Sequence, residues 1–308
     1  MNSDARRGVL YGIGAYGLWG VFPLYFRLLE RSGALEVVLH RVLWSLLVCL
    51  AVVAAVRGWA ELRAVLVVTR YVVTLGVGAV LLAVNWGVYI YAVNSGQVVE
   101  ASLGYYINPL VTVLLGVLVL RERLRSLQWA AVGVGALAVA VLTAAYGRPP
   151  FIALTLALSF GLYGLIKNRV GASVGALASL TTETLVLAPV AAAGLVWLER
   201  DGQGHFTDNP PWQGLLLASV GVATVIPLLF FAAAARRVPL STVGLLQYLT
   251  PTLQLLCGVV LLGEHMSPAR WAGFALVWVA LVVLTADTVR AASRRRTEAR
   301  IAEPVGAA

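Results

Sequence analysis

The sequence predicts an all-α integral membrane protein with ten transmembrane helices, and three observations lead to this fold class. The 308 residues are 60% hydrophobic and only 12% charged, with a mean hydropathy of +0.87, whereas soluble domains carry roughly 25% charged residues. The charges form short clusters, and the apolar runs between them have about 20 residues, the length that crosses a bilayer core. Because backbone polar groups must be satisfied within lipid, runs of this kind are helices.

In chain order, the predicted helices cover residues 8–27, 36–56, 71–93, 98–120, 127–146, 149–167, 177–198, 213–235, 238–262 and 268–289. The first has no small-residue cleavage site after it, so we expect it to be retained rather than removed as a signal peptide. The only sizeable polar connection, 199–212, is too short to be a domain. Cys49 and Cys257 fall in the middle of apolar runs, which predicts buried, unpaired thiols and no metal site.

The positive charges predict the orientation of the bundle. The chain has 23 lysine and arginine residues, and most lie at the termini and in alternate connections. The opposite connections hold only Arg27, Arg31, Arg148, Arg200 and Arg270. The positive-inside rule therefore places both termini, including a basic tail at 291–308, in the cytoplasm of a bacterial-type inner membrane. This distribution explains the net charge of +9, so no nucleic-acid partner is expected.

An internal repeat relates the two halves of the chain. A shift of 142 residues superposes Leu103 on Leu245, Tyr106 on Tyr248, Pro109 on Pro251, Gly116 on Gly258, Glu122 on Glu264 and Trp129 on Trp271. The predicted halves are 1–147 and 148–290, with five helices each. An odd number of helices makes the second half enter the membrane from the opposite side, as in many secondary transporters. Chance similarity between apolar helices is the alternative.

Polar side chains inside predicted spans are candidate functional residues, because they are costly in hydrocarbon. They are His40, Arg41, Asn85, Glu100, Asn108, Glu183, Gln247 and Gln254. Arg41 and Glu100 lie near the same membrane face, so we expect them to form an ion pair. The 142-residue shift maps Arg41 onto Glu183, which suggests alternating gates or a binding site. A structural ion pair, or a side chain extending to the interface, is the alternative reading.

Two prolines and their neighbours add to this set. Pro109 and Pro251 occupy equivalent positions within helices, where each leaves a carbonyl without its usual donor, so each is a candidate hinge; ordinary helix curvature is the alternative. Tyr105, Tyr106 and Tyr248 lie beside them and could line an apolar cavity with hydroxyl groups. Trp59 is expected to anchor a helix at the membrane surface.

The segment Glu100-Ala-Ser-Leu-Gly-Tyr-Tyr-Ile-Asn-Pro-Leu110, followed by Gly116 and Arg121-Glu122-Arg123, resembles the RarD branch of the EamA family in the drug/metabolite transporter superfamily. His40-Arg41-Val-x-Trp44-Ser45, Asn85-Trp86 and Gln247-Tyr248-x-x-Pro251-Thr252 support the resemblance, which covers nearly the whole chain. It implies ten helices in two inverted repeats and transport of small metabolites. It also adds Trp86 to the candidate site.

The sequence thus predicts a secondary transporter of a small molecule, with no cofactor and no catalytic residues. It contains no phosphate-binding glycine loop and no zinc signature, so the energy would come from an ion or substrate gradient. His40, Glu100 and Glu183 could carry a proton. A membrane-embedded enzyme, with His205 and Asp208 as its only loop candidates, and a non-transporting sensor or partner subunit are the alternatives. The substrate and the oligomeric state stay open.

Overall fold

The computed structural model describes residues 3–121, 124–171, 173–207, 210–238 and 240–302, and these residues are predominantly helical. Within them, ten helical segments are long and apolar enough to cross a membrane. These spans are Asp4–Arg27, Glu30–Ala55, Thr69–Asn94, Val98–Val119, Ser126–Tyr146, Phe151–Val170, Ala176–Arg200, Pro211–Ala235, Thr242–Leu261 and Pro268–Arg290. Each overlaps a predicted helix, so the predicted all-α membrane fold is confirmed.

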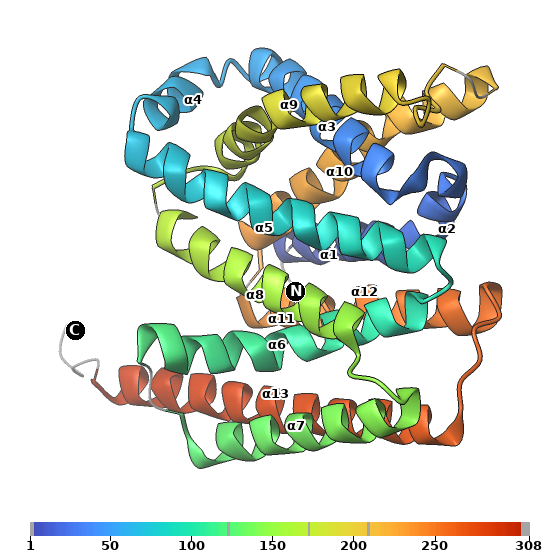
Figure 1. Cartoon of the computed structure of the whole chain (residues 1–308). Coiled ribbons are helices and arrows are strands. Elements are labelled where there is room, and N and C mark those ends of the chain that lie inside the picture. The colour runs from blue at the N-terminus through green and yellow to red at the C-terminus, as the bar shows by residue number, and fades with distance from the viewer. Residues whose placement is uncertain (1–2, 122–123, 172, 208–209, 239, 303–308) are drawn as a thin grey trace, which may run out of the picture. The chain divides into compact units, whose positions relative to one another are not determined.

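The spans correspond to named helices in Figure 1. The first half contains α1 (Ser3–Gly20), α2 (Phe22–Arg27), η1 (Glu30–Ser32), α3 (Gly33–Ala55), α4 (Trp59–Leu66), α5 (Thr69–Asn94), α6 (Val98–Leu120) and α7 (Ser126–Tyr146). The second half contains α8 (Phe151–Gly171), α9 (Ala176–Arg200), α10 (Pro211–Ala235), α11 (Leu240–Leu246), α12 (Leu249–Leu256), η2 (Cys257–Leu261) and α13 (Pro268–Ala302).

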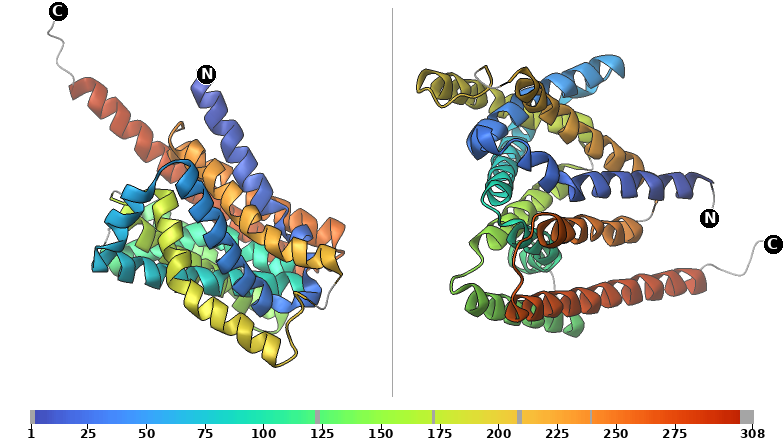
Figure 2. Two further views of the ribbon diagram at one scale, coloured as in Figure 1. Left: turned by 90° about the horizontal axis from the view of Figure 1, so that it is seen from above. Right: turned by 90° about the vertical axis from the view of Figure 1, so that its right-hand side faces the viewer.

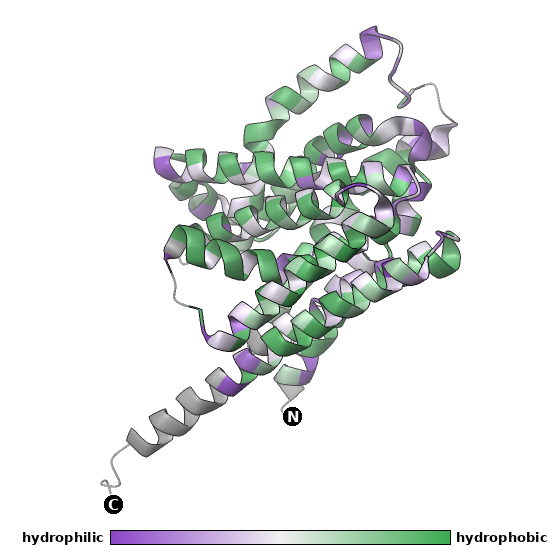
Figure 3. Cartoon of the chain, turned by 60° about the horizontal axis from the view of Figure 1, so that its bottom comes forward, coloured by the Kyte–Doolittle hydropathy of each residue, from purple (hydrophilic) through white to green (hydrophobic). Residues whose placement is uncertain are grey.

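Large apolar side chains cover the outside of the helices. Leu215 is 72% exposed, Val190 68% and Val282 68%, and Figure 3 shows apolar residues along the helices, with hydrophilic residues gathered near their ends. A water-soluble protein rarely exposes so continuous an apolar surface. Lipid contact explains it, so the chain is a multi-pass membrane protein.

The chain divides into two compact units. The first contains Met1–Asn108 and Phe151–His265. In it α3 packs against α9 and α10, α5 packs against α8 and α9, and α1 packs against α10 and α12. Figure 2 shows α3 beside α9 in its left view and α1 beside α12 in its right view.

The second unit contains Pro109–Pro150 and Met266–Ala308. Its main feature is the pair α7 and α13, which lie along each other (Figure 1). Arg125, just before α7, donates a hydrogen bond of 2.8 Å from Nε to Asp287 Oδ2 on α13. The side chains beyond Arg290, in the predicted basic tail, lie outside the described part of the chain.

Helix contacts inside the first unit occur in pairs, in which each helix of one half is replaced by the equivalent helix of the other half. The contact of α3 with α10 has its counterpart in the contact of α9 with α5, and that of α1 with α10 in that of α8 with α5. The helices α3 and α9 are counterparts and pack on each other. This exchange is the pattern expected of two inverted five-helix repeats.

Three local features differ from the predicted helices. The first span is interrupted at Val21, between α1 and α2. The short helix α4 was not predicted; its Trp59 is 42% exposed, as a surface anchor would be. The ninth span is broken at Gln247 and Tyr248 and ends in η2, a turn of π-helix.

The two prolines have different settings. Pro109 lies inside the continuous helix α6, whereas Pro251 occupies the first turn of α12, directly after the break. A first turn tolerates proline because its amide groups have no partner within the helix. The hinge role of both prolines stays a prediction.

Candidate functional site

The buried cation Arg41 is the centre of the candidate site. It lies about two turns into α3 and is 4% exposed. Its Nε donates a hydrogen bond of 2.9 Å to the hydroxyl of Thr224 on α10. Among the residues that the structure describes, Arg41 forms no ion pair, which is unusual for a charge inside a membrane span.

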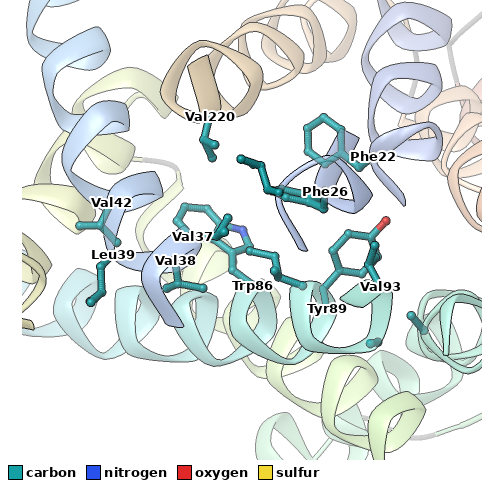
Figure 4. Packing of buried hydrophobic residues seen from close by; sticks show 14 of the residues in the cluster. Phe22, Phe26, Val37, Val38, Leu39, Val42, Trp86, Tyr89, Val93 and Val220 are labelled. Carbon is teal, nitrogen blue, oxygen red and sulfur yellow. The ribbon is translucent and has the colours of Figure 1, made fainter. Parts of the chain in front are cut away.

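Aromatic rings from α2 and α5 surround the guanidinium. Its central carbon lies 4.0 Å from the ring centroid of Trp86, 5.4 Å from that of Phe26 and 5.8 Å from that of Phe22. Each distance is within the range of a cation–π interaction. Figure 4 shows the rings of Phe22, Phe26, Trp86 and Tyr89 in this cluster, together with Val220 of α10.

Tyrosine hydroxyls lie at the edge of this cluster. The phenol groups of Tyr25, Tyr89 and Tyr105 are within electrostatic range of the guanidinium. The Tyr25 hydroxyl is hydrogen bonded to Ser219 on α10 at 2.7 Å. The Tyr89 hydroxyl is buried and has no hydrogen-bond partner in the described part of the chain.

A glycine brings Thr224 to Arg41. A Cβ atom on Gly221 of α10 would collide with the backbone of Trp44 on α3, so only glycine lets these two helices approach so closely. Thr224 follows one turn later. Its hydroxyl donates to Val220 O at 2.8 Å, which leaves the oxygen to accept from Arg41. The guanidinium is therefore held along its Nε edge.

The predicted site residues Asn85 and Asn108 connect helices. Asn85 of α5 donates to Leu156 O and to the Ser159 hydroxyl of α8, both at 3.1 Å, and accepts from the Tyr105 hydroxyl of α6 at 3.1 Å. Asn108 donates to Ala157 O at 3.1 Å. Asn85 and Tyr105 thus border the aromatic cluster while their polar atoms hold α5, α6 and α8 together.

The ion pair predicted between Arg41 and Glu100 is not formed. A carboxylate oxygen of Glu100 accepts a hydrogen bond of 3.0 Å from the backbone N–H of Ile152, at the start of α8. Unsatisfied N–H groups and the helix dipole favour a carboxylate there. Arg41 is directed instead toward the aromatic rings.

Glu183, the counterpart of Arg41 in the second half, forms an ion pair. It is 1% exposed, and its carboxylate lies 2.8 Å from Lys167 Nζ of α8. Further hydrogen bonds come from Tyr163 at 3.1 Å and from Ser179 at 3.1 Å. The arrangement gives this buried carboxylate both a counter-ion and hydroxyl donors.

His40 belongs to a separate cluster at the start of α3. Its Nε2 lies 3.9 Å from the carboxylate of Glu36, and its ring stacks on Phe206 at 4.8 Å. The same carboxylate accepts from the backbone N–H of His205 at 2.7 Å and contacts its ring at 3.1 Å. His205 thus fastens the connection after α9 to α3. Asp208, the other loop residue considered for catalysis, lies outside the described residues, as do Glu122 and Arg123.

The candidates in the ninth span lie near α1. Gln247 and Tyr248 occupy the break between α11 and α12 and are partly buried. Gln254 donates to Trp19 O at 3.2 Å, and Thr250 donates to Tyr16 O at 2.8 Å. Tyr106 shares a hydrogen bond of 2.7 Å with Thr252. None of these contacts joins the ninth span to Arg41.

Several residues of the site were not predicted from the sequence. They are Phe22, Phe26, Glu36, Tyr89, Lys167 and Thr224. Tyr89 carried a usable signal, because it follows Asn85 by one helical turn and so shares its face. Lys167 and Glu183 flank the same short connection, which also signals a pair. Nothing in the sequence marked Thr224 as a site residue.

The described residues contain no group of three or more His, Cys, Asp or Glu side chains that could hold a metal. Cys49 and Cys257 are buried free thiols, as predicted.

Sequence comparison identifies the family. A model of the EamA-like transporter family matches residues 6–144 and again residues 149–286. The chain belongs to this family. Its EamA relatives include a protein named RarD of Streptomyces exfoliatus, 50% identical over 98% of this chain and 96% of that one. Another is a protein named RarD of Escherichia coli, 40% identical over 96% and 98% of the two chains.

An uncharacterised transporter of Pseudomonas aeruginosa is 45% identical over 95% of this chain and 98% of its own. These relatives place the chain in the RarD branch of the EamA family, as the sequence motifs predicted, and make it a membrane transporter. A solved crystal structure covers 92% of this chain and 98% of its own with a TM-score of 0.56 and 23% identity. It shares the fold.

Proposed function

We propose that this protein is a secondary transporter that moves a small metabolite or drug-like molecule by alternating access. The halves 1–147 and 148–290 would exchange conformations around a shared site, with both termini in the cytoplasm. One observation carries the proposal: a charged side chain is buried at the same repeat position in each half, Arg41 at 4% and Glu183 at 1% exposure. Charges at such positions are costly in a membrane and are generally kept for function.

Arg41 and Glu183 have different partners, as expected if the two halves hold different conformations at one stage of a transport cycle. Glu183 is satisfied by Lys167 within its own half, while Arg41 lies among aromatic rings from α2 and α5 and beside Thr224 of α10. Inverted repeats exchange their conformations during alternating access. We therefore assign substrate binding to the Arg41 side and gating to the Glu183 side.

A proton is the coupling ion that the buried groups favour. Glu183, and Glu36 with His40, are titratable and lie inside membrane spans, and such carboxylates and histidines form proton relays in transporters. Substrate binding or gating by Asn85, Trp86, Glu100, Tyr105, Asn108, Gln247 and Tyr248 belongs to the same proposal, as do hinges at Pro109 and Pro251.

Flux through purified protein in liposomes tests the function. Vesicles loaded with a bacterial metabolite extract should lose or gain at least one compound only when the protein is present, and an imposed pH gradient should change the rate. Glu183→Gln should abolish this flux, whereas Glu30→Gln, which changes an exposed carboxylate, should retain it. Absence of flux for every compound, or hydrolysis of one without its movement, would contradict the proposal.

A further inference from the structure

In the described part of the chain, every buried charged side chain but one contacts a side chain that can carry the opposite charge or, for a carboxylate, a backbone N–H donor. Glu183 pairs with Lys167, Asp287 with Arg125, and Glu36 with His205. Glu100 accepts from the N–H of Ile152. Arg41 has one neutral hydroxyl and aromatic faces. Among the described residues, one buried positive charge is therefore left without an anion.

The free part of the guanidinium is the part that recognises carboxylates. Nε is bound to Thr224, whose hydroxyl proton is already donated to Val220 O. The terminal nitrogens have no hydrogen-bond partner among the described residues. A planar guanidinium offers parallel N–H groups that match the two oxygens of a carboxylate.

A second unused polar group lies in the same cluster. In the described part of the chain, the Tyr89 hydroxyl is buried without a hydrogen-bond partner. The Tyr89 ring is 6.0 Å from Phe26 and 5.8 Å from Tyr105, centroid to centroid. A buried hydroxyl without a hydrogen bond costs free energy. An anion that contacted both Arg41 and this hydroxyl would give the hydroxyl an acceptor.

The walls of the cluster select the rest of the ligand. Phe22, Phe26 and Trp86 present apolar ring faces, which suit an apolar body. Among the described residues, Arg41 is the one cation in this cluster, and a single cation compensates a monoanion but not a dianion. This favours a carboxylate over a phosphate group.

We propose that Arg41 and Tyr89 bind the carboxylate of the transported molecule, an organic monoanion whose apolar body packs on Phe22, Phe26 and Trp86. The inference rests on the proposed transport function and names its substrate class. It also assigns a role to Tyr89, a binding residue that donates a hydrogen bond to the ligand.

A charge-matched panel tests the assignment by binding alone. The panel contains phenylacetate, phenylacetamide, phenethylamine and acetate, and binding to the purified full chain in detergent is measured by thermal stabilisation and tryptophan fluorescence. Phenylacetate should bind at least about tenfold more tightly than the amide or the amine, because a charge-assisted pair exceeds a neutral one by that much. Acetate should bind more weakly than phenylacetate, since it lacks the apolar body.

Variants then locate the site. Tyr89→Phe removes a buried hydroxyl that has no partner among the described residues. It should therefore keep or raise thermal stability while weakening phenylacetate binding by about threefold to tenfold. Arg41→Gln should abolish the preference for phenylacetate over phenylacetamide, and Arg31→Gln, an exposed control, should keep it. A purely structural Tyr89 would leave binding unchanged.

The assignment is overturned if the anion binds no better than the amide, including the case in which no member binds, or if Tyr89→Phe has no effect on binding. Flux of the same panel into proteoliposomes separates this inference from the proposed function. Anion-selective binding without flux of any compound would retain the site and reject transport. Flux of a neutral or cationic compound that survives Arg41→Gln would retain transport and reject the anion site.

Discussion

The guanidinium of Arg41 and the indole ring of Trp86 lie 4.0 Å apart, measured from the central carbon to the ring centroid. Both side chains are buried. The ring quadrupole attracts the cation and lowers the cost of its burial. The ring has no net charge, however, so the positive charge stays uncompensated. This contact stabilises the buried cation while the guanidinium remains available to an anion.

Substitution of Trp86 should separate ring electrostatics from packing. We expect Trp86→Leu to lower the free energy of unfolding by about 2 to 4 kcal/mol, because it removes both the cation–π contact and buried volume. Trp86→Phe should cost about half as much, since a smaller ring remains beneath the cation. Thermal unfolding in detergent measures both. Trp197→Leu, at a 54% exposed position, is the control and should change little; equal losses for Leu and Phe at position 86 would exclude an electrostatic role.

Replacement of Gly221 should disturb the site from a distance. The added methyl group of Gly221→Ala would collide with the Trp44 backbone and push α10 away from α3, which also moves Thr224 from Arg41. We expect a loss of about 1 to 3 kcal/mol in stability and weaker binding at the site. Gly164→Ala is the matched control, because a Cβ atom there meets nothing within 4 Å, and it should be neutral or slightly stabilising. An equally mild effect at both glycines would show that the helices do not need this close approach.

The sequence predicted the spans well because burial in lipid depends on residue composition along the chain. All ten spans follow from apolar runs, and the repeat follows from pairs such as Pro109 and Pro251. It did not predict α4, whose eight residues are too few to register as a span. It also missed the break at Gln247 and Tyr248, since the apolar character continues through it.

Partners of polar side chains were harder to predict, because they depend on how helices face one another. Arg41 and Glu100 had suitable depths for an ion pair, but Glu100 accepts from Ile152 N at the start of α8. Which helix begins beside Glu100 is decided by packing that hydropathy does not encode. Thr224 reaches Arg41 only because Gly221 lets α10 approach α3.

The contact between Glu36 and His205 should control the connection after α9. Glu36→Gln removes the charge while keeping the shape, and we expect the backbone N–H of His205 to lose a charge-assisted acceptor worth about 1.5 to 3 kcal/mol. Limited proteolysis and hydrogen exchange of residues 201–207 should then speed up by at least about tenfold. Glu30→Gln is the control on an exposed carboxylate nearby and should leave both rates unchanged. Unaltered exchange in Glu36→Gln would show that other contacts hold this connection.

The ion pair between Lys167 and Glu183 should be a strongly coupled pair, and a double-mutant cycle measures it. Each single change, Lys167→Met or Glu183→Gln, disrupts a pair whose Glu183 side chain is 1% exposed. The double change removes both charges at once, so it should cost less than the sum of the single changes. We expect a coupling free energy of about 1.5 to 3 kcal/mol from thermal unfolding.

The exposed pair Arg27 and Glu30 supplies the matched control for this cycle. Their side chains are 45% and 48% exposed at a distance of 3.1 Å, and a solvent-screened pair of this kind couples by less than about 1 kcal/mol. If Lys167 and Glu183 gate the transporter, the double variant should recover stability but not flux, because the gate needs charges that can separate. Recovery of both would make the pair a purely structural tie between α8 and α9, and equal coupling in the two cycles would show that burial does not strengthen it.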